Sequence, residues 1–225
     1  MKKPAVNYRE FRFSRLNEPR FSHVWLLLDW FAYIAMYILT ERLIPVERCH
    51  VVHCALDDII PFHEGFLVFY CYWYVLLAGS LLYFFLYDVR SFRRLQVYII
   101  ITQIVAMAAY IAWPSVQQLR PDSFARDNLL TRVLGAIYAV DTPTGVCPSL
   151  HAAYSLGIAS VWWKAKGVPG AWKAWIVASA LLICASAVFV KQHSVIDILA
   201  AIPVALFAEA LVFGRTRLRR WIERG

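Results

Sequence analysis

The fold is decided at a short stretch past the middle of the chain, Cys147-Pro148-Ser149-Leu150-His151. A polar segment precedes this stretch and a long apolar run follows it. Proline suits the first turn of a helix, where a backbone N–H has no acceptor, so we expect a helix to begin at Pro148. The N–H groups of Ser149, Leu150 and His151, with the helix dipole behind them, would then bind an anion. The Ser149 hydroxyl and the His151 imidazole make phosphate the expected anion.

Apolar runs of about 17 to 23 residues recur along the chain, close to the length that crosses roughly 30 Å of hydrocarbon as a helix. The composition agrees, because 60% of the 225 residues are hydrophobic, more than in soluble domains. We therefore expect an all-α membrane protein with six transmembrane helices in one bundle. The expected spans are Val24 to Thr40, Gly65 to Tyr87, Leu95 to Trp113, Pro148 to Trp163, Ala174 to Val190 and Val195 to Phe213.

Basic residues are distributed unevenly in this chain of net charge +8. Of the 23 Lys and Arg residues, 17 lie in segments 1–23, 88–94, 164–173 and 214–225, which six spans would place on one side. That side is expected to be cytoplasmic, with the active site on the external face of a bacterial plasma membrane. The chain then divides into a basic tail (1–23), a membrane domain (24–213) and a second basic tail (214–225). The second tail would contact anionic lipid, and nucleic acid is not an expected partner.

A histidine and an aspartate stand four residues apart at the start of the last span. On a helix, His193 and Asp197 share one face, so the carboxylate can hold one imidazole nitrogen and leave the other nucleophilic. A helix-capping histidine beside an acid gives the same pattern without catalysis. The expected topology favours catalysis, because it brings Arg120, His151 and Lys191 to the same external face.

The first external segment contains residues that could be mistaken for a metal cluster: His50, His53, Asp57, Asp58 and His63. The apolar residues between them fit a short helix on the membrane surface equally well. No CxxC or other metal-ligand spacing occurs, so we expect neither a metal nor another cofactor. A disulfide among Cys49, Cys54 and Cys147 stays open if the external compartment is oxidising.

Three short motifs lie in the expected third loop, at the start of the fourth span and around the start of the sixth: Arg120-Pro121, then Pro148-Ser149-Leu150-His151, then Ser186 with His193 and Asp197. They resemble the motifs K-x6-R-P, P-S-G-H and S-R-x5-H-x3-D of the type 2 phosphatidic acid phosphatase superfamily, the membrane lipid phosphatases related to vanadium haloperoxidases. The resemblance covers most of the chain from about Asp57 onward. The six expected spans and the places of the motifs agree with it.

The chain departs from these motifs at two positively charged positions. Trp113 stands where the first motif has lysine, and Ala187 stands where the third has arginine; Leu150 replaces the glycine of the second. A phosphate would then depend on Arg120, the backbone N–H groups of the second motif and Lys191. The second and third motifs look more like the branch that contains inositol phosphorylceramide synthases. Transfer of a phospho-head group to an alcohol is therefore open beside hydrolysis.

The resemblance implies a role for each site residue. His193 would attack a lipid phosphate or pyrophosphate to form a phosphohistidine, Asp197 would orient and charge-stabilise His193, and His151 would protonate the leaving oxygen. Arg120 and Ser149, with the N–H groups that follow Ser149, would stabilise the charge on the phosphate oxygens. No metal takes part in this scheme, and the motifs do not identify the lipid.

Two other classes of protein remain open at this stage. A haem protein could ligate iron from two sides through His151 and His193, which come from different spans. A non-enzymatic lipid-binding relative of the fold would account for the two missing cations.

Overall fold

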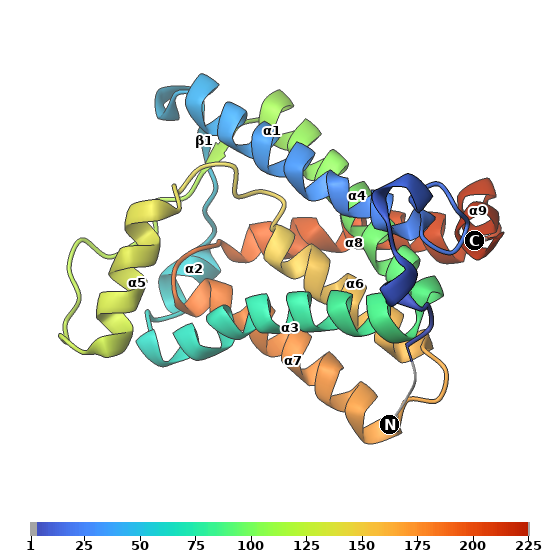
Figure 1. Ribbon diagram of the computed structural model, residues 1–225. Coiled ribbons are helices and arrows are strands. Elements are labelled where there is room, and N and C mark those ends of the chain that lie inside the picture. The colour runs from blue at the N-terminus through green and yellow to red at the C-terminus, as the bar shows by residue number, and fades with distance from the viewer. Residues whose placement is uncertain (1–3, 225) are drawn as a thin grey trace.

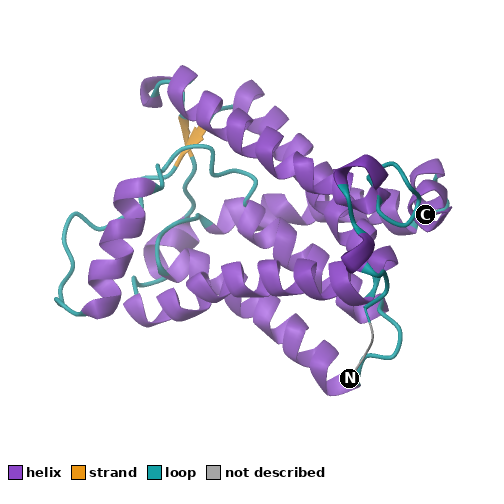
Figure 2. Ribbon diagram, viewed as in Figure 1, coloured by secondary structure: helices purple, strands orange, loops and turns teal. Residues whose placement is uncertain are grey.

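The structure, a computed structural model, describes residues 4–224. It is built of helices, with two short strands at one end (Figures 1 and 2). The α-helices are α1 (Asp29–Leu43), α2 (Ala55–Ile59), α3 (Leu67–Tyr87), α4 (Val89–Ala112), α5 (Leu129–Val140), α6 (Leu150–Lys164), α7 (Gly170–Phe189), α8 (Val195–Phe213) and α9 (Arg217–Arg224). The 3-10 helices are Tyr8–Glu10, Phe13–Arg15, Ser22–Leu28, Val46–Arg48 and Glu64–Phe66, and the strands are β1 (His50–Val51) and β2 (Ser115–Val116). The expected all-α class is confirmed.

Within residues 4–224, five helical segments are long and apolar enough to cross a membrane: Ser22–Leu43, Glu64–Tyr87, Val89–Ala112, Gly170–Phe189 and Val195–Phe213. They correspond to five of the six expected spans. The largest difference is at α4, which begins at Val89 instead of Leu95. Its first turns include Arg93, which is buried and donates to the Pro19 carbonyl and the Ser22 hydroxyl. A helix can begin with arginines when other segments supply their acceptors.

The sixth expected span corresponds to α6, which has only 15 residues. At 1.5 Å per residue it is about 22 Å long, shorter than the roughly 30 Å of hydrocarbon, so six spans are not confirmed. Helix α6 packs against α3, α4, α7 and α8, and most of its side chains are buried. A helix enclosed in this way is apolar on every side, which explains why its composition resembled that of a span.

One close contact sets the distance between α6 and α4. A Cβ atom at Gly157 of α6 would lie 2.4 Å from the Tyr98 ring of α4, so only glycine fits there without movement. The Tyr98 hydroxyl donates to the Ala205 carbonyl of α8 at 3.0 Å. Three helices are therefore joined at the centre of the bundle.

Both described ends of the chain lie at one end of the bundle, which we call the tail end (Figure 1). The backbone N–H of Ala5 donates to the Leu86 carbonyl at the end of α3. Arg94 of α4 pairs with Glu223 of α9 at 2.9 Å. The α6–α7 connection also lies there, because Lys164 pairs at 2.7 Å with Glu209 near the end of α8. The basic segments singled out in the sequence therefore gather at one end.

The opposite end, which we call the site end, carries α2, α5 and both strands (Figure 1). Strands β1 and β2 pair in parallel, with His50 opposite Ser115 and Val51 opposite Val116. This pairing joins the segment before α2 to the segment after α4. The short helix expected in the first external segment is present as α2, whereas α5 was not expected from the sequence.

We expect the site end to face outward and the tail end to face the cytoplasm. In a chain whose five native cysteines are replaced, an impermeant maleimide should label Ala125→Cys in intact cells and Lys166→Cys only after lysis. Both positions are exposed, at opposite ends of the bundle. The opposite labelling pattern would invert the orientation.

Candidate active site

Helix α6 begins at Leu150, and Ser149 is its N-cap residue. The Ser149 hydroxyl accepts from the N–H of the third helical residue at 3.4 Å, and the Ser149 N–H donates to the Asp197 carbonyl at 3.0 Å. Two expectations were therefore wrong: Pro148 is not the first helical residue, and the Ser149 N–H is not free. Serine is a favoured N-cap, and it displaces the helix start by two residues. The N–H groups of Leu150 and His151 have no acceptor among the described residues.

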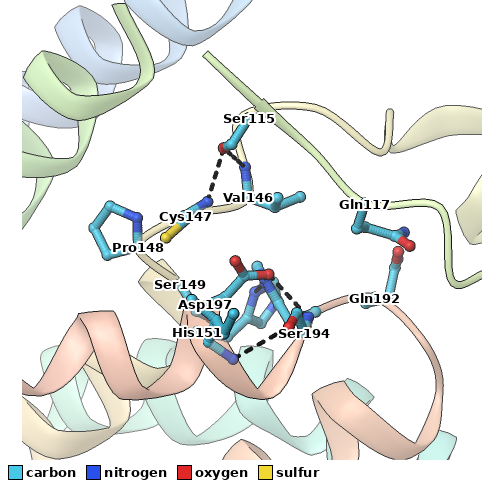
Figure 3. Close-up of polar contacts among 12 residues, drawn as sticks. Ser115, Gln117, Val146, Cys147, Pro148, Ser149, His151, Gln192, Ser194 and Asp197 are labelled. Atoms are coloured by element: carbon cyan, nitrogen blue, oxygen red, sulfur yellow. Dashed lines mark hydrogen bonds and ion pairs between the residues drawn. The ribbon is translucent and has the colours of Figure 1, made fainter. Parts of the chain in front are cut away.

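The segment that leads into α6 is held by β2 (Figure 3). The Ser115 hydroxyl accepts from the N–H groups of Val146 at 3.2 Å and Cys147 at 3.1 Å, and the Cys147–Pro148 peptide bond is cis. Burial, together with the nearby Asp197 carboxylate, raises the pKa of the Cys147 thiol to about 12. This thiol is therefore protonated at neutral pH and is no competing nucleophile.

His193 lies in the turn between α7 and α8, directly before the α8 N-cap residue Ser194. The Asp197 Oδ2 atom accepts from the Ser194 N–H at 2.9 Å and contacts His193 Nδ1 at 3.2 Å. Because a carboxylate can only accept, His193 Nδ1 carries the proton and Nε2 keeps its lone pair. The structure thus contains the predicted His–Asp pair, with Asp197 fully buried and His193 almost so.

The two histidines of the second and third motifs are in contact. His193 Nε2 lies 3.4 Å from His151 Nδ1, at hydrogen-bonding distance. Since His193 Nε2 has the lone pair, His151 Nδ1 is the donor. The His151 ring packs against Tyr70 and Trp73, with centroid distances of 4.8 Å and 4.3 Å. These aromatic neighbours fix the ring plane, so that the N–H of His151 is directed at the candidate nucleophile.

Arg120 contacts Gln192, the residue directly before His193 in the chain. Its guanidinium donates to the Gln192 side chain at 2.6 Å and to the Tyr138 carbonyl at 3.1 Å, and it lies 4.5 Å over the Tyr138 ring. Gln192 also donates to the Asp141 carboxylate at 3.2 Å. Burial raises the pKa of Asp141, and nearby Arg120 opposes the rise. A positive and a negative group therefore stand together beside His193.

A cavity of about 380 Å³ opens beside the histidines. Its lining includes His151, His193 and Asp141, the Leu150 side chain, and aromatic side chains of α1, α3, α4 and α6: Trp30, Tyr33, Tyr37, Trp73, Tyr74, Tyr110 and Tyr154. No lysine or arginine is among its lining residues in the described part of the chain. A larger cavity of about 520 Å³, lined by α3, α6 and α7, contains neither histidine.

Lys191 lies away from this cavity. Its Nζ donates to the carbonyls of Asp57 at 2.8 Å and Ile60 at 2.6 Å, and its backbone has φ = 53°. Ser149 is also outside the lining, fully buried in its capping role. Phosphate binding by Lys191 and Ser149 stays a prediction, while Leu150 and His151 border the cavity itself.

The histidines and acids of the first external segment have separate partners. His50 stacks on Trp113, His53 contacts Asp58 at 2.8 Å, and His63 Nδ1 accepts from the Gly65 N–H. Residues 4–224 contain no group of three His, Cys, Asp or Glu side chains that could hold a metal. Cys49, Cys54 and Cys147 are free thiols, so the structure contains none of the disulfides that the sequence left open.

Three residues of the site were not singled out from the sequence: Gln192, Asp141 and, as a partner of the His193 turn, Asp57. Gln192 stands next to His193, and this adjacency is the one sequence signal that could have found it. Asp141 and Asp57 lie 52 and 136 positions before His193. Nothing in the spacing could place them there, because only the folded bundle brings the three segments together.

The chain was also compared with known proteins. It matches no protein-family model, no curated protein and no solved structure.

Proposed function

We propose that this protein is a membrane-embedded phosphatase that acts on a lipid phosphate or pyrophosphate through a phosphohistidine on His193. The observation that carries the proposal is the chain of contacts from Asp197 Oδ2 to His193 Nδ1 at 3.2 Å, and from His193 Nε2 to His151 Nδ1 at 3.4 Å. An oriented imidazole whose second nitrogen keeps its lone pair, with another imidazole beside that nitrogen, is an arrangement suited to nucleophilic phosphoryl transfer. The apolar helices support a lipid substrate.

In the proposed reaction His193 Nε2 attacks phosphorus, and the bond to the leaving oxygen breaks. His151, whose imidazolium form is favoured by the negative charge of the bound phosphate, gives a proton to that oxygen and becomes neutral. The Asp197 carboxylate stabilises the positive charge that His193 acquires. Water then attacks the phosphohistidine and gives a proton to His151, so that phosphate leaves and both histidines return to their initial states. The N–H groups of Leu150 and His151 are donors for the phosphate oxygens.

The charges around the cavity favour a second candidate, a phosphotransferase that uses a lipid phosphodiester. Arg120 is one residue removed from the cavity, Asp141 lines it, and Lys191 is bound elsewhere. A phosphomonoester carries close to two negative charges above its second pKa near 6, whereas a diester carries one. One arginine partly offset by a carboxylate suits a single negative charge better.

The charges around the cavity predict how the preference between a monoester and a diester substrate changes with pH. For phosphatidate and its methyl ester with the same acyl chains, we expect the ratio of kcat/KM, monoester over diester, to fall up to tenfold per pH unit above about pH 6, where the monoester becomes a dianion. Because both substrates use the same histidines, titration of the enzyme cancels in the ratio. A ratio that stays constant or rises with pH would mean that the site accepts the dianion.

The two rival classes are less well supported by the geometry. A haem would need space for a porphyrin between His151 and His193, but these rings touch, and Tyr70 and Trp73 pack against His151. A purely lipid-binding protein has no need for a buried His–Asp pair aimed at a second histidine. Release of phosphate from a panel of lipid phosphates by the solubilised protein separates an enzyme from a binding protein.

A further inference from the structure

Asp57 of α2 lies beside the turn that carries His193. Its side chain is almost completely buried. The Oδ2 atom accepts from the Ser194 hydroxyl at 2.6 Å and the Cys54 N–H at 2.8 Å, and Oδ1 accepts from the Val195 N–H at 2.9 Å. Burial raises the pKa of Asp57, but these hydrogen bonds lower it further than burial raises it. The group is therefore a carboxylate at neutral pH.

The same segment also holds the residue two positions before His193. The Lys191 ammonium donates to the carbonyls of Asp57 and Ile60, and the Lys191 backbone is in the left-handed region, at φ = 53°. That conformation is uncommon for residues other than glycine, so it requires support from its surroundings. The two carbonyls supply this support by fixing the far end of the side chain.

Capping of α8 alone does not account for Asp57. The helix already has a complete capping box between Ser194 and Asp197, and the Ser194 hydroxyl also accepts from the Ile196 N–H. Asp57 adds contacts to Ser194 and Val195 from outside the helix, while Lys191 is held on the other side of His193. The turn is thus bound to α2 both before and after the histidine.

We propose that Asp57 is a positioning residue: with Lys191, it locks the 191–195 turn onto α2 so that His193 keeps the orientation in which Asp197 holds Nδ1 and Nε2 meets His151. This inference rests on the proposed function only for its kinetic consequence. It also gives Lys191 a role that needs no contact with phosphate.

The test compares Asp57→Asn with the matched neighbour variant Asp58→Asn. In Asp57→Asn the amide NH2 must face a backbone N–H, either that of Val195 in the turn or that of Cys54 at the start of α2, so the lock loses either a direct contact or the cap of the helix that carries it. We expect kcat to fall about 10²-fold, the scale of a small misplacement of a catalytic group, with KM nearly unchanged. Asp58, an exposed residue that contacts His53, should be replaceable without effect.

A second readout is independent of activity. In ¹⁵N-histidine NMR of the wild-type protein, His193 should show a single tautomer with the proton on Nδ1. In Asp57→Asn and in Lys191→Met, which keeps the aliphatic stem, the shifts should move toward the average of both tautomers. A loss of thermal stability with an unchanged His193 signal and unchanged kcat per folded molecule would reduce Asp57 to a structural role. If the wild-type protein had no turnover, the proposed function would fail, while the NMR comparison would still decide the lock.

The Lys191→Met variant also separates the two roles of the lysine. If the ammonium holds the turn, its loss should lower kcat equally for phosphatidate and for its methyl ester. If it binds phosphate instead, the loss should be larger for the dianionic monoester. A charge-dependent loss, with the His193 tautomer unchanged, would overturn the proposed lock.

Discussion

We expect His193→Ala to abolish the proposed turnover of lipid phosphates, by roughly 10⁶-fold, the loss found when a nucleophile is removed from a catalytic unit. The expected loss follows from the position of the His193 ring in the site. His193 lines the cavity, and its Nε2 is the imidazole nitrogen that faces His151. The nearby Cys147 thiol does not replace it, since burial and Asp197 raise the pKa of this thiol to about 12.

The measurement is phosphate release together with trapping of the intermediate. Wild-type protein quenched during turnover of a ³²P-labelled lipid phosphate should carry an acid-labile, alkali-stable label, and His193→Ala should carry none. His53→Ala is the matched control, because His53 is an exposed histidine of the same end of the molecule, paired with Asp58. A His193→Ala variant with near wild-type activity would exclude the phosphohistidine on this residue.

The sequence predicted the helical class and five helices that are long and apolar enough to span a membrane, because lipid-facing helices must be apolar over a fixed length. It could not distinguish α6 from a span, since a helix enclosed by other helices is equally apolar. The position of Ser149 shows a similar limit. Proline and serine are both favoured at helix starts, and which of them begins the helix depends on the contact of Ser149 with Asp197.

The His193–Asp197 pair could be predicted because its members are only four residues apart, although His193 lies in the turn before α8 and only Asp197 lies in the helix. The contacts of the neighbouring residues could not be predicted from spacing in the same way. Lys191 was predicted to bind phosphate because it stands close to His193 in sequence, but its left-handed backbone turns the ammonium toward α2. The direction of a side chain in a turn depends on φ and ψ, which the spacing of residues does not determine.

Asp197→Asn should lower kcat by about 10² to 10⁴-fold, and the structure indicates the lower part of this range. The two candidate effects of the change are loss of charge and loss of the correct His193 tautomer. Asp197 Oδ2 accepts from the Ser194 N–H as well as from His193. An amide NH2 in the position of Oδ2 would face the Ser194 N–H, donor against donor. The amide oxygen should therefore occupy the Oδ2 position and accept from both Ser194 N–H and His193 Nδ1–H. The proton then stays on His193 Nδ1, and only the charge is lost.

Comparison with Asp197→Ala tests this argument. Alanine removes the charge, the orientation and the choice of tautomer together, so its kcat should be at least about tenfold below that of the asparagine variant, on the scale of one lost hydrogen bond to a charged group. ¹⁵N-histidine NMR should show His193 protonated on Nδ1 in Asp197→Asn and averaged between tautomers in Asp197→Ala. Equal rates for the two variants would mean that the carboxylate acts through its charge alone. Wild-type activity in both would remove Asp197 from the mechanism, and with it the reason to regard His193 as the activated nucleophile.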